Sequence, residues 1–336
     1  MAHGAGGKAT RRLVDGLFVP LLYDAQIGSE PDRLSDAARV AVGRSDVAIT
    51  TDSFVVTPLV FPGGSIGELA VNGTINDLAV SGSRPVALVT TFVLEAGLPT
   101  ETLAAEVRAM GRAARAAGVA IVGGDTKVVE HGKTDRLYIT TTGIGQPLPG
   151  VSLSARSVRP GDKVLLSGPI GDHGITILLA RGELDLEAEL VSDTRSVFPL
   201  VEALVAAVAP GLRWMRDPTR GGVATSLNEL ALDSGVGIHL FEEAIPVRDE
   251  VRGACELLGL DPLHIANEGQ FLAVVAPDQA DAALAALRAV PGGQGAGAVL
   301  VGEVREEPAT AVLVTTRYGG SRIVDMLVGD PLPRIC

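Results

Sequence analysis

A proline-rich segment near the middle of the chain separates two halves that share one pattern. The segment QPLPGVSLSARSVRPGD, residues 146–162, contains three prolines and shows no hydrophobic period. On each side of it, short β-branched and apolar runs alternate with helical runs, which is typical of α/β folds with mixed sheets. At 336 residues the chain is long enough for two domains. We predict domains over 1–150 and 151–326, followed by a mobile tail over 327–336.

The local patterns predict the elements of each half. In the first half, strands are predicted over 46–56, 85–95, 119–127 and 136–145, with helices over 65–82 and 100–117. Thr100 is expected to cap the second helix and Gly118 to end it, and the strand at 119–127 is expected to run into a glycine turn. In the second half, strands are predicted over 162–168, 213–217, 236–241, 271–276, 298–304 and 311–316, and helices over 171–182, 195–209, 221–235 and 278–290. Residues 13–44 are expected to be loosely helical. The similar mix of elements suggests a duplicated architecture.

Composition excludes several classes of protein. The formal net charge is −12 and no basic stripe is present, so we expect no nucleic-acid partner. Binding of a polyanion such as ATP would require a divalent cation between the carboxylates and the phosphates. No apolar run reaches the roughly 18 residues of a membrane span, and the N-terminus has no signal pattern. We therefore expect a cytoplasmic protein that does not contact membranes.

Two cysteines are too few for a disulfide framework, and they differ in setting. Cys255 falls on the apolar side of a predicted helix, as an ordinary buried thiol does. Cys336 is the last residue and follows Pro331 and Pro333. Prolines favour an extended arm of roughly 3 Å per residue, so ten residues could carry the thiol some 30 Å. We predict that the tail has an inward and an outward position.

Carboxylates occur in apolar surroundings at three places in the first half. Asp52 lies in a predicted strand, Asp77 follows Asn76 in a predicted helix, and Asp125 follows Gly123 and Gly124 after a run that reads as a buried strand. Such charges are rarely buried alone, and three that converge would suit Mg²⁺. The alternative is separate salt bridges or caps. Glu68, Asn72 and Asn76 share a helix face that could support a metal-bound triphosphate, or could simply face solvent.

Glycine-rich segments could approach phosphates. HGAGGK contains Gly4, Gly6, Gly7 and Lys8, but it is not a Walker A loop because Ala9 follows the lysine; it could also be a flexible terminus. SGPIGDHG and RDPTRGG place Asp172 with His173, and Arg220, at predicted helix starts. Lys127, near Asp125 and Thr126, could contact a phosphate or form a plain ion pair. Asn267 and Glu268 precede a buried strand.

Together these segments resemble one family closely. AHGAGGK, TTDS, PLVFPGG, GTINDLAVSG, GGDTKVV, SGPIGDHG, RDPTRGG, RGACELLGLDPL, ANEG and PRIC occur in this order and cover essentially the whole chain. They are similar to the HypE family of hydrogenase maturation factors, the carbamoyl dehydratases. The glycine and aspartate motifs alone indicate the wider superfamily of aminoimidazole ribonucleotide synthetase, thiamine monophosphate kinase and selenophosphate synthetase.

The resemblance implies a fold and a reaction. The fold would have two α/β domains and a flexible tail, with a homodimer built on a shared β-barrel and with ATP and Mg²⁺ between the domains. A HypF-type carbamoyltransferase would load a carbamoyl group on Cys336. This chain would then dehydrate it to a thiocyanate with ATP, and a HypC–HypD complex would receive the cyano group for the iron of NiFe hydrogenase.

The same resemblance implies roles for individual residues. Asp52, Asp77 and Asp125 would hold the metal, Lys127 would act on the oxygen or phosphate, and Glu268 would be the base. The residues implied for nucleotide binding are Gly4, Gly6, Gly7, Lys8, Asn76, Gly123, Gly124, Thr126, Asp172 and Arg220.

Two alternatives remain open from the sequence. A sister kinase or synthetase shares the superfamily motifs, but it gives no reason for a cysteine on a proline-stiffened arm, and a selenophosphate synthetase would carry cysteine or selenocysteine near the N-terminal glycines. A non-enzymatic carrier would display Cys336 to partners and use ATP for shape alone. ATP turnover that depends on a carbamoylated Cys336 would distinguish an enzyme from a carrier.

Overall fold

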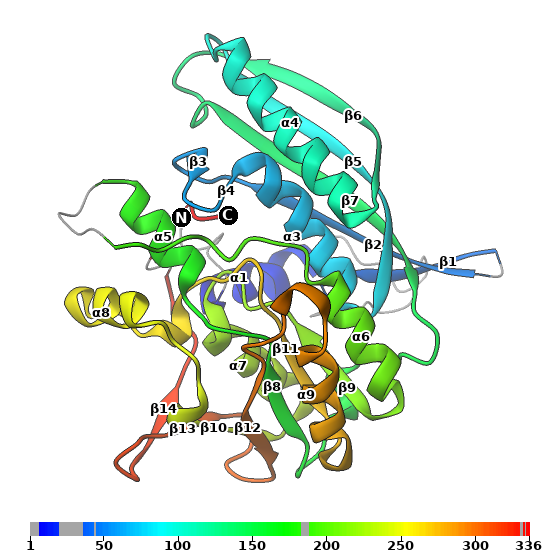
Figure 1. Cartoon of the computed structure of the whole chain (residues 1–336), viewed down its shortest axis with the longest axis vertical. Coiled ribbons are helices and arrows are strands. Elements are labelled where there is room, and N and C mark those ends of the chain that lie inside the picture. Colours follow the sequence, from blue (N-terminus) through cyan, green and yellow to red (C-terminus); the bar gives the residue numbers. More distant parts are fainter. Residues whose placement is uncertain (1–6, 20–35, 44, 183–187, 330–331, 333) are drawn as a thin grey trace.

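A computed structural model describes residues 7–19, 36–43, 45–182, 188–329, 332 and 334–336. Two α/β units, one from each half of the chain, pack against each other (Figure 1). The α/β class predicted from the sequence is confirmed. Among the described residues, no helix is both long and apolar enough to cross a membrane.

The first unit is a five-stranded sheet with two helices on one face (Figure 1). Its strand order is β1-β2-β7-β5-β6, antiparallel except for β5 and β6. The strands are β1 (Ala38–Val42), β2 (Ser45–Phe54), β5 (Ser83–Glu95), β6 (Ala120–Val129) and β7 (Leu137–Pro147); the helices are α3 (Ile66–Val80) and α4 (Thr100–Ala117). A small hairpin, β3 (Val60–Phe61) and β4 (Gly64–Ser65), precedes α3, and α1 (Gly7–Leu13) with a π-helical turn (Val14–Phe18) lies near the second unit.

The second unit is a seven-stranded sheet in the order β14-β13-β10-β12-β8-β11-β9. Only β10 and β13 run parallel. The strands are β8 (Lys163–Leu166), β9 (Leu212–Arg216), β10 (Gly237–Phe241), β11 (Leu272–Val275), β12 (Val299–Arg305), β13 (Val312–Thr315) and β14 (Ser321–Val324). The helices are α5 (Asp172–Ala180), α6 (Phe198–Val208), α7 (Gly222–Ser234), α8 (Asp249–Leu258) and α9 (Ala280–Arg288). Short 3-10 turns are Ala155–Ser157, Ala209–Gly211, Glu242–Ala244, Pro262–His264, Pro277–Gln279 and Pro291–Gly293.

Several local predictions differ from the structure. Thr100 is the first residue of α4 rather than its cap, because Pro99 holds the cap position without a side-chain hydrogen bond. The glycine turn expected after 119–127 is absent, and β6 continues through both glycines to Val129. Residues 38–42 form β1 rather than a helix, and 20–35 lie outside the described residues. The two sheets differ in strand number and order, so strand order does not support the suggested duplication.

Helix α3 packs unusually closely because it is rich in glycine. A Cβ on Gly67 would lie 2.4 Å from the Glu106 carbonyl oxygen of α4, and one on Gly73 would lie 2.7 Å from the Phe54 ring. Only glycine permits such close approach. The core around α3 also includes residues of the second unit, such as Ile175 and Ile177, so the two units share one apolar cluster.

The start of α3 is stabilised by a buried carboxylate from α4. Glu106 is 1% exposed, and its Oε2 accepts the Gly67 N–H at 2.9 Å. Glu106→Ala would leave this donor unsatisfied, and we expect a loss of about 1–3 kcal/mol of unfolding free energy. Urea denaturation measures the loss, with exposed Glu101→Ala as the matched control. Equal midpoints for the two variants would contradict this role for Glu106.

Candidate active site

Carboxylates from both units meet beneath α3. Asp36 precedes β1, Asp77 lies in α3, and Asp217 follows β9; one carboxylate oxygen from each lies within 4.8 Å of the others. The Thr50 hydroxyl donates to Asp77 Oδ2 at 2.9 Å. Burial, followed by repulsion from Asp217, Asp36 and Asp52, raises the pKa of Asp77 well above its usual value. Hard oxygen ligands crowded in this way suit a divalent cation such as Mg²⁺.

Two arginines balance only part of this negative charge. Arg216 Nε lies 2.7 Å from Asp36 Oδ1, and its Nη2 lies 3.5 Å from Glu229 Oε2. Burial alone would lower the pKa of Arg216, but Asp36, Glu229 and Asp217 raise it above the ordinary value, so the guanidinium stays charged. Burial raises the pKa of Asp52, and the positive charge of nearby Arg220 offsets part of this rise. The carboxylates of this cluster outnumber the two arginines, so a bound cation would balance the remaining negative charge.

Glu268 is buried beside this acidic cluster. It is 3% exposed, and its Oε1 has no hydrogen-bond partner among the described residues. The Asn76 amide donates to the Glu268 carbonyl at 3.0 Å, and Asp193 Oδ1 accepts the Glu268 N–H at 3.0 Å. Burial, with repulsion from Asp217 and other carboxylates, raises the pKa of Glu268 well above its usual value. A fixed backbone and an unpartnered carboxyl oxygen suit a group that exchanges protons with a substrate.

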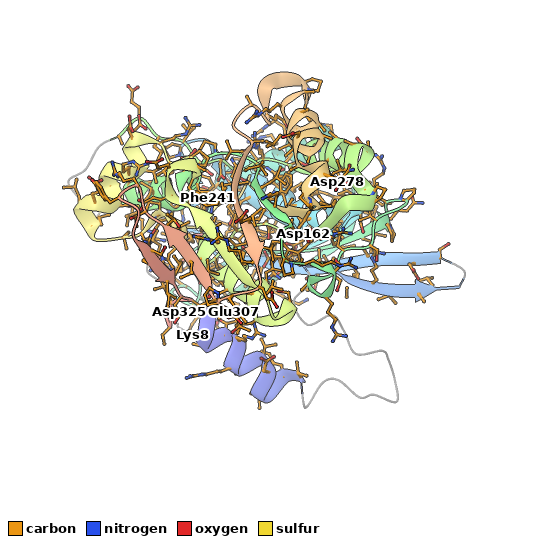
Figure 2. All side chains as sticks on the ribbon, turned by 90° about the horizontal axis from the view of Figure 1, so that it is seen from below. Lys8, Asp162, Phe241, Asp278, Glu307 and Asp325 are labelled. Carbon is orange, nitrogen blue, oxygen red and sulfur yellow. The ribbon has the colours of Figure 1, made fainter. Side chains whose placement is uncertain are left out.

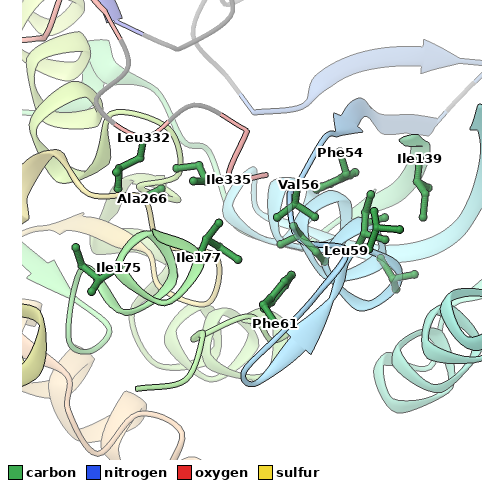
Figure 3. Packing of buried hydrophobic residues seen from close by; sticks show 14 of the residues in the cluster. Phe54, Val56, Leu59, Phe61, Ile139, Ile175, Ile177, Ala266, Leu332 and Ile335 are labelled. Atoms are coloured by element: carbon green, nitrogen blue, oxygen red, sulfur yellow. The ribbon is translucent and has the colours of Figure 1, made fainter. Parts of the chain in front are cut away.

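The tail docks in its inward position, between the two units. The Val55 N–H donates to a main-chain oxygen of Cys336, the last residue, at 2.9 Å. The side chains of Ile335 and Leu332 are 3% and 4% exposed, and Figure 3 shows Ile335 between Ile177 and Val56. Arg334 forms two hydrogen bonds to Asp135, at 2.9 and 3.0 Å. One of the two predicted tail positions is therefore present; the outward one stays a prediction.

Cys336 is bonded through its backbone next to Phe54, and Glu268 lies near Gly73 of α3. Cys336 pairs with Val55, which follows Phe54 in the chain. The Phe54 ring packs on Gly73, and Glu268 Oε2 lies 3.9 Å from where a Cβ of Gly73 would be. Cys336 itself is half-buried.

Asp125 does not join Asp52 and Asp77 within one chain. Asp52 pairs with Thr141, Thr141 with Thr90, and Thr90 with Gly124. Gly124 therefore lies about 14 Å across the sheet from Asp52, at about 4.8 Å per strand, and Asp125 points to the opposite face. There its carboxylate pairs with Lys127 Nζ at 2.6 Å, with both side chains more than half exposed. Neighbouring Gly123 and Thr126 lie on the same exposed strand.

Several of the residues predicted to bind nucleotide do not lie in the acidic cluster. Gly4 and Gly6 lie outside the described residues. Gly7 begins α1, and Lys8 pairs with Asp325 near the start of the tail (Figure 2), not with the acidic cluster. The Asp172 carboxylate is 4% exposed and receives Arg248 Nε at 2.8 Å.

The three polar residues predicted to share one face of α3, namely Glu68, Asn72 and Asn76, have different surroundings. Asn76 ties the two units together by donating to the carbonyls of Arg195 and Glu268 and accepting the Val197 N–H. Glu68 and Asn72 line a separate cleft of about 440 Å³. They are therefore not part of the acidic cluster.

Sequence reasoning missed Asp36, Asp193 and Asp217. Asp217 was within reach, because it follows a strand directly in RDPTRGG, the motif that drew attention to Arg220. Asp36 and Asp193 have no comparable local signal, since their roles depend on contacts between segments far apart in the chain.

The fold and this site define a class of two-domain proteins. The model of the AIR synthase related protein N-terminal domain matches residues 34–146, and the model of its C-terminal domain matches residues 159–315. The chain is 51% identical to the carbamoyl dehydratase HypE of Azotobacter vinelandii, covering 100% of this chain and 96% of the relative. With these two matches, the chain belongs to the HypE family of carbamoyl dehydratases.

Two solved structures agree with this assignment. A HypE in complex with ATP is 45% identical, with a TM-score of 0.82 over 99% of this chain and 98% of that one. A HypE–HypF complex contains a chain 43% identical, with a TM-score of 0.86 over 94% of this chain and 99% of that one.

Proposed function

We propose that this chain uses ATP to dehydrate a carbamoyl group carried on Cys336, giving a thiocyanate. The observation that supports the proposal is the docked tail: the backbone of Cys336 bonds Val55 at the junction of the two units, where Asn76 also bonds the Glu268 backbone and carboxylates of both units converge. Kinship to HypE carbamoyl dehydratases and to a HypE that binds ATP supports both the reaction and the cosubstrate.

The reaction removes oxygen from the carbamoyl carbon in two steps. The carbamoyl oxygen attacks the γ-phosphorus of ATP, and the bond from that phosphorus to ADP breaks. The carbon–oxygen bond then breaks with phosphate as the leaving group, the nitrogen loses its two protons, one to Glu268 and one to the departing phosphate, and a carbon–nitrogen triple bond forms. The products are the thiocyanate, ADP and phosphate. Glu268 is the proposed acceptor of an N–H proton, and a carboxylate with a raised pKa is a stronger base once ionised.

Mg²⁺ fits the acidic cluster. Asp36, Asp77 and Asp217 would hold it, with Asp52 alongside, because their oxygens converge in excess over the neighbouring arginines. When bound there, the cation would neutralise negative charge on the phosphates of ATP. Burial raises the pKa values of Asp52 and Glu268, and the positive charge of Arg220 offsets part of that rise in both.

The proposed partners are those that the family resemblance implies. A HypF-type carbamoyltransferase would load Cys336, in keeping with the solved HypE–HypF complex of relatives. A HypC–HypD iron complex would receive the cyano group for the iron of NiFe hydrogenase. Both transfers require the thiol to leave the junction, which is the reason for the outward position. We place the reaction in the cytoplasm, where ATP is available.

A homodimer through the five-stranded sheet is part of the proposal. The sheet face opposite α3 carries apolar side chains that are about two-fifths exposed, namely Ile49, Val89 and Ile144. A second copy would cover them, in keeping with the shared barrel that the family resemblance implies. Asp125 and Lys127 point to this same face, so they are candidates for a metal or phosphate role only in such a dimer.

The test is ATP turnover that depends on the loaded thiol. Phosphate release is measured for the intact protein before and after carbamoylation by its transferase, with Cys336→Ala as the matched control. An enzyme releases one phosphate for each carbamoyl group, and the variant releases none above background. Phosphate release that ignores the carbamoyl group would instead support a carrier that uses ATP for shape.

A further inference from the structure

The end of the tail pairs with the chain like a short edge strand. The main-chain oxygens of Arg334 and Cys336 accept the N–H groups of Thr57, at 3.3 Å, and Val55, at 2.9 Å. This spacing of two residues on each side is that of paired strands. Arg334 itself has a φ of 57°, so the tail is not a regular strand. The Ile335 carbonyl, which lies between these two oxygens in the chain, accepts its hydrogen bond from elsewhere.

His173, near the start of α5, supplies that donor. Its Nε2 lies 2.6 Å from the Ile335 carbonyl oxygen, and the side chain is completely buried. A carbonyl can only accept, so the hydrogen is on Nε2. Nδ1 then accepts from the Ser192 hydroxyl, at 2.8 Å, and the Ser192 oxygen in turn accepts the Thr194 N–H at 3.1 Å. Burial also lowers the pKa of His173 to about 4, which keeps the ring neutral.

The surroundings make this hydrogen bond consequential. Ile335 and Leu332 are buried in the apolar cluster that includes Ile177 and Phe61, and the Phe61 ring meets the His173 ring edge-on at 5.6 Å. A carbonyl buried there without a donor would lose its hydration and gain nothing in return. When the tail leaves, the carbonyl regains water, whereas the His173 N–H stays in its pocket. The hydrogen bond therefore favours the inward position, because it satisfies both the Ile335 carbonyl and the His173 N–H.

We propose that His173 is a positioning residue for the dehydration step: its Nε2–H holds the Ile335 carbonyl and so fixes the peptide group that carries Cys336 in the junction. Val55 of the first unit holds the main-chain oxygen of Cys336, and His173 of the second unit holds the carbonyl of Ile335. The residue that carries the thiol is therefore held by both units. The consequence for catalysis rests on the proposed function, whereas the consequence for tail position does not.

Thiol reactivity tests the tail position without ATP or any partner. The background is Cys255→Ala, which leaves Cys336 as the one thiol; Cys255 is 1% exposed and burial raises its pKa to about 11. In this background, His173→Phe keeps a flat ring but lacks the donor, and His173→Gln retains a side-chain N–H. Modification by a maleimide should be about five- to tenfold faster in the Phe variant and close to the parent rate in the Gln variant, as expected for one hydrogen bond. His239→Phe, at a buried histidine of β10 that pairs with Thr315, is the matched control and should not change the rate.

The second readout is single-turnover dehydration of carbamoylated protein. It should slow in His173→Phe and recover in His173→Gln, while loading by the transferase stays at least as fast as in the parent. Circular dichroism melting checks that the variants fold. A folded His173→Phe protein with parental thiol reactivity would overturn the proposal, as would a Gln variant no better than Phe. If the thiol reacts faster in His173→Phe but the parent protein does not dehydrate its carbamoyl group, the role of His173 in tail position stands and the proposed function is refuted.

Discussion

Glu268→Gln is expected to abolish dehydration while leaving the loading of Cys336 intact. Glutamine has nearly the size of glutamate and fits the same pocket, but its amide cannot take up a proton at neutral pH. Loss of a general base lowers rates by about 10²–10⁴-fold. Single-turnover experiments on carbamoylated protein, followed by intact mass, measure this loss.

The matched control for Glu268 is Glu303→Gln. Glu303 lies on β12 and pairs with Lys163 at 2.8 Å, well away from the tail. We expect its dehydration rate to stay within about twofold of the parent, since surface ion pairs contribute little. A Glu268→Gln protein that dehydrates at the parental rate would remove Glu268 from the mechanism and return attention to Asp217.

Asp77→Asn is expected to weaken Mg²⁺-dependent ATP binding and to stabilise the metal-free fold. The asparagine oxygen can still accept the hydrogen bond of the Thr50 hydroxyl, but the charge is gone. Loss of one carboxylate from the proposed set should weaken Mg²⁺-supported ATP binding by at least about tenfold, since even groups that only orient metal ligands matter 10–100-fold. Titration calorimetry with ATP, with and without Mg²⁺, measures this.

Asp77→Asn should stabilise the metal-free fold even though it weakens ATP binding, because the buried carboxyl group is costly when no cation is bound. At pH 7 an unfolded chain ionises Asp77 freely, whereas the folded chain must retain its proton or bury a charge beside Asp36 and Asp217. Both cost free energy, so removing the carboxyl should raise the melting temperature, by about 2–4 °C per kcal/mol. Asp46→Asn, at an exposed position on β2, is the control. A lower melting temperature for Asp77→Asn would show that the cluster is not a source of repulsion.

The sequence was sufficient for the elements that depend on local patterns. The strand at 46–56 and the helices at 65–82 and 100–117 correspond to β2, α3 and α4, because strand-forming and helix-forming composition is a local property, although the predicted Thr100 cap was wrong. The family resemblance supplied Glu268 and Cys336, and the structure places both at the junction between the units. Their roles in the reaction stay predictions until activity is measured.

What the sequence could not provide is the pairing of segments far apart. Asp125 has the same kind of setting as Asp52, yet β7 and β5 lie between their strands and strand register turns it to the other face. Asp36 and Asp193 gain their importance only from contacts with distant segments. His173 stood in a noted motif, but only the docked tail shows what its ring nitrogens contact.

The most direct test of the central claim is the intact mass of the protein after incubation with its carbamoyltransferase and carbamoyl phosphate, with and without ATP. Our account predicts the gain of one carbamoyl group on Cys336, followed by the loss of one water only when ATP is present, and no gain in Cys336→Ala. A carbamoyl group that persists unchanged with ATP and Mg²⁺ would contradict the claim that this chain is a dehydratase.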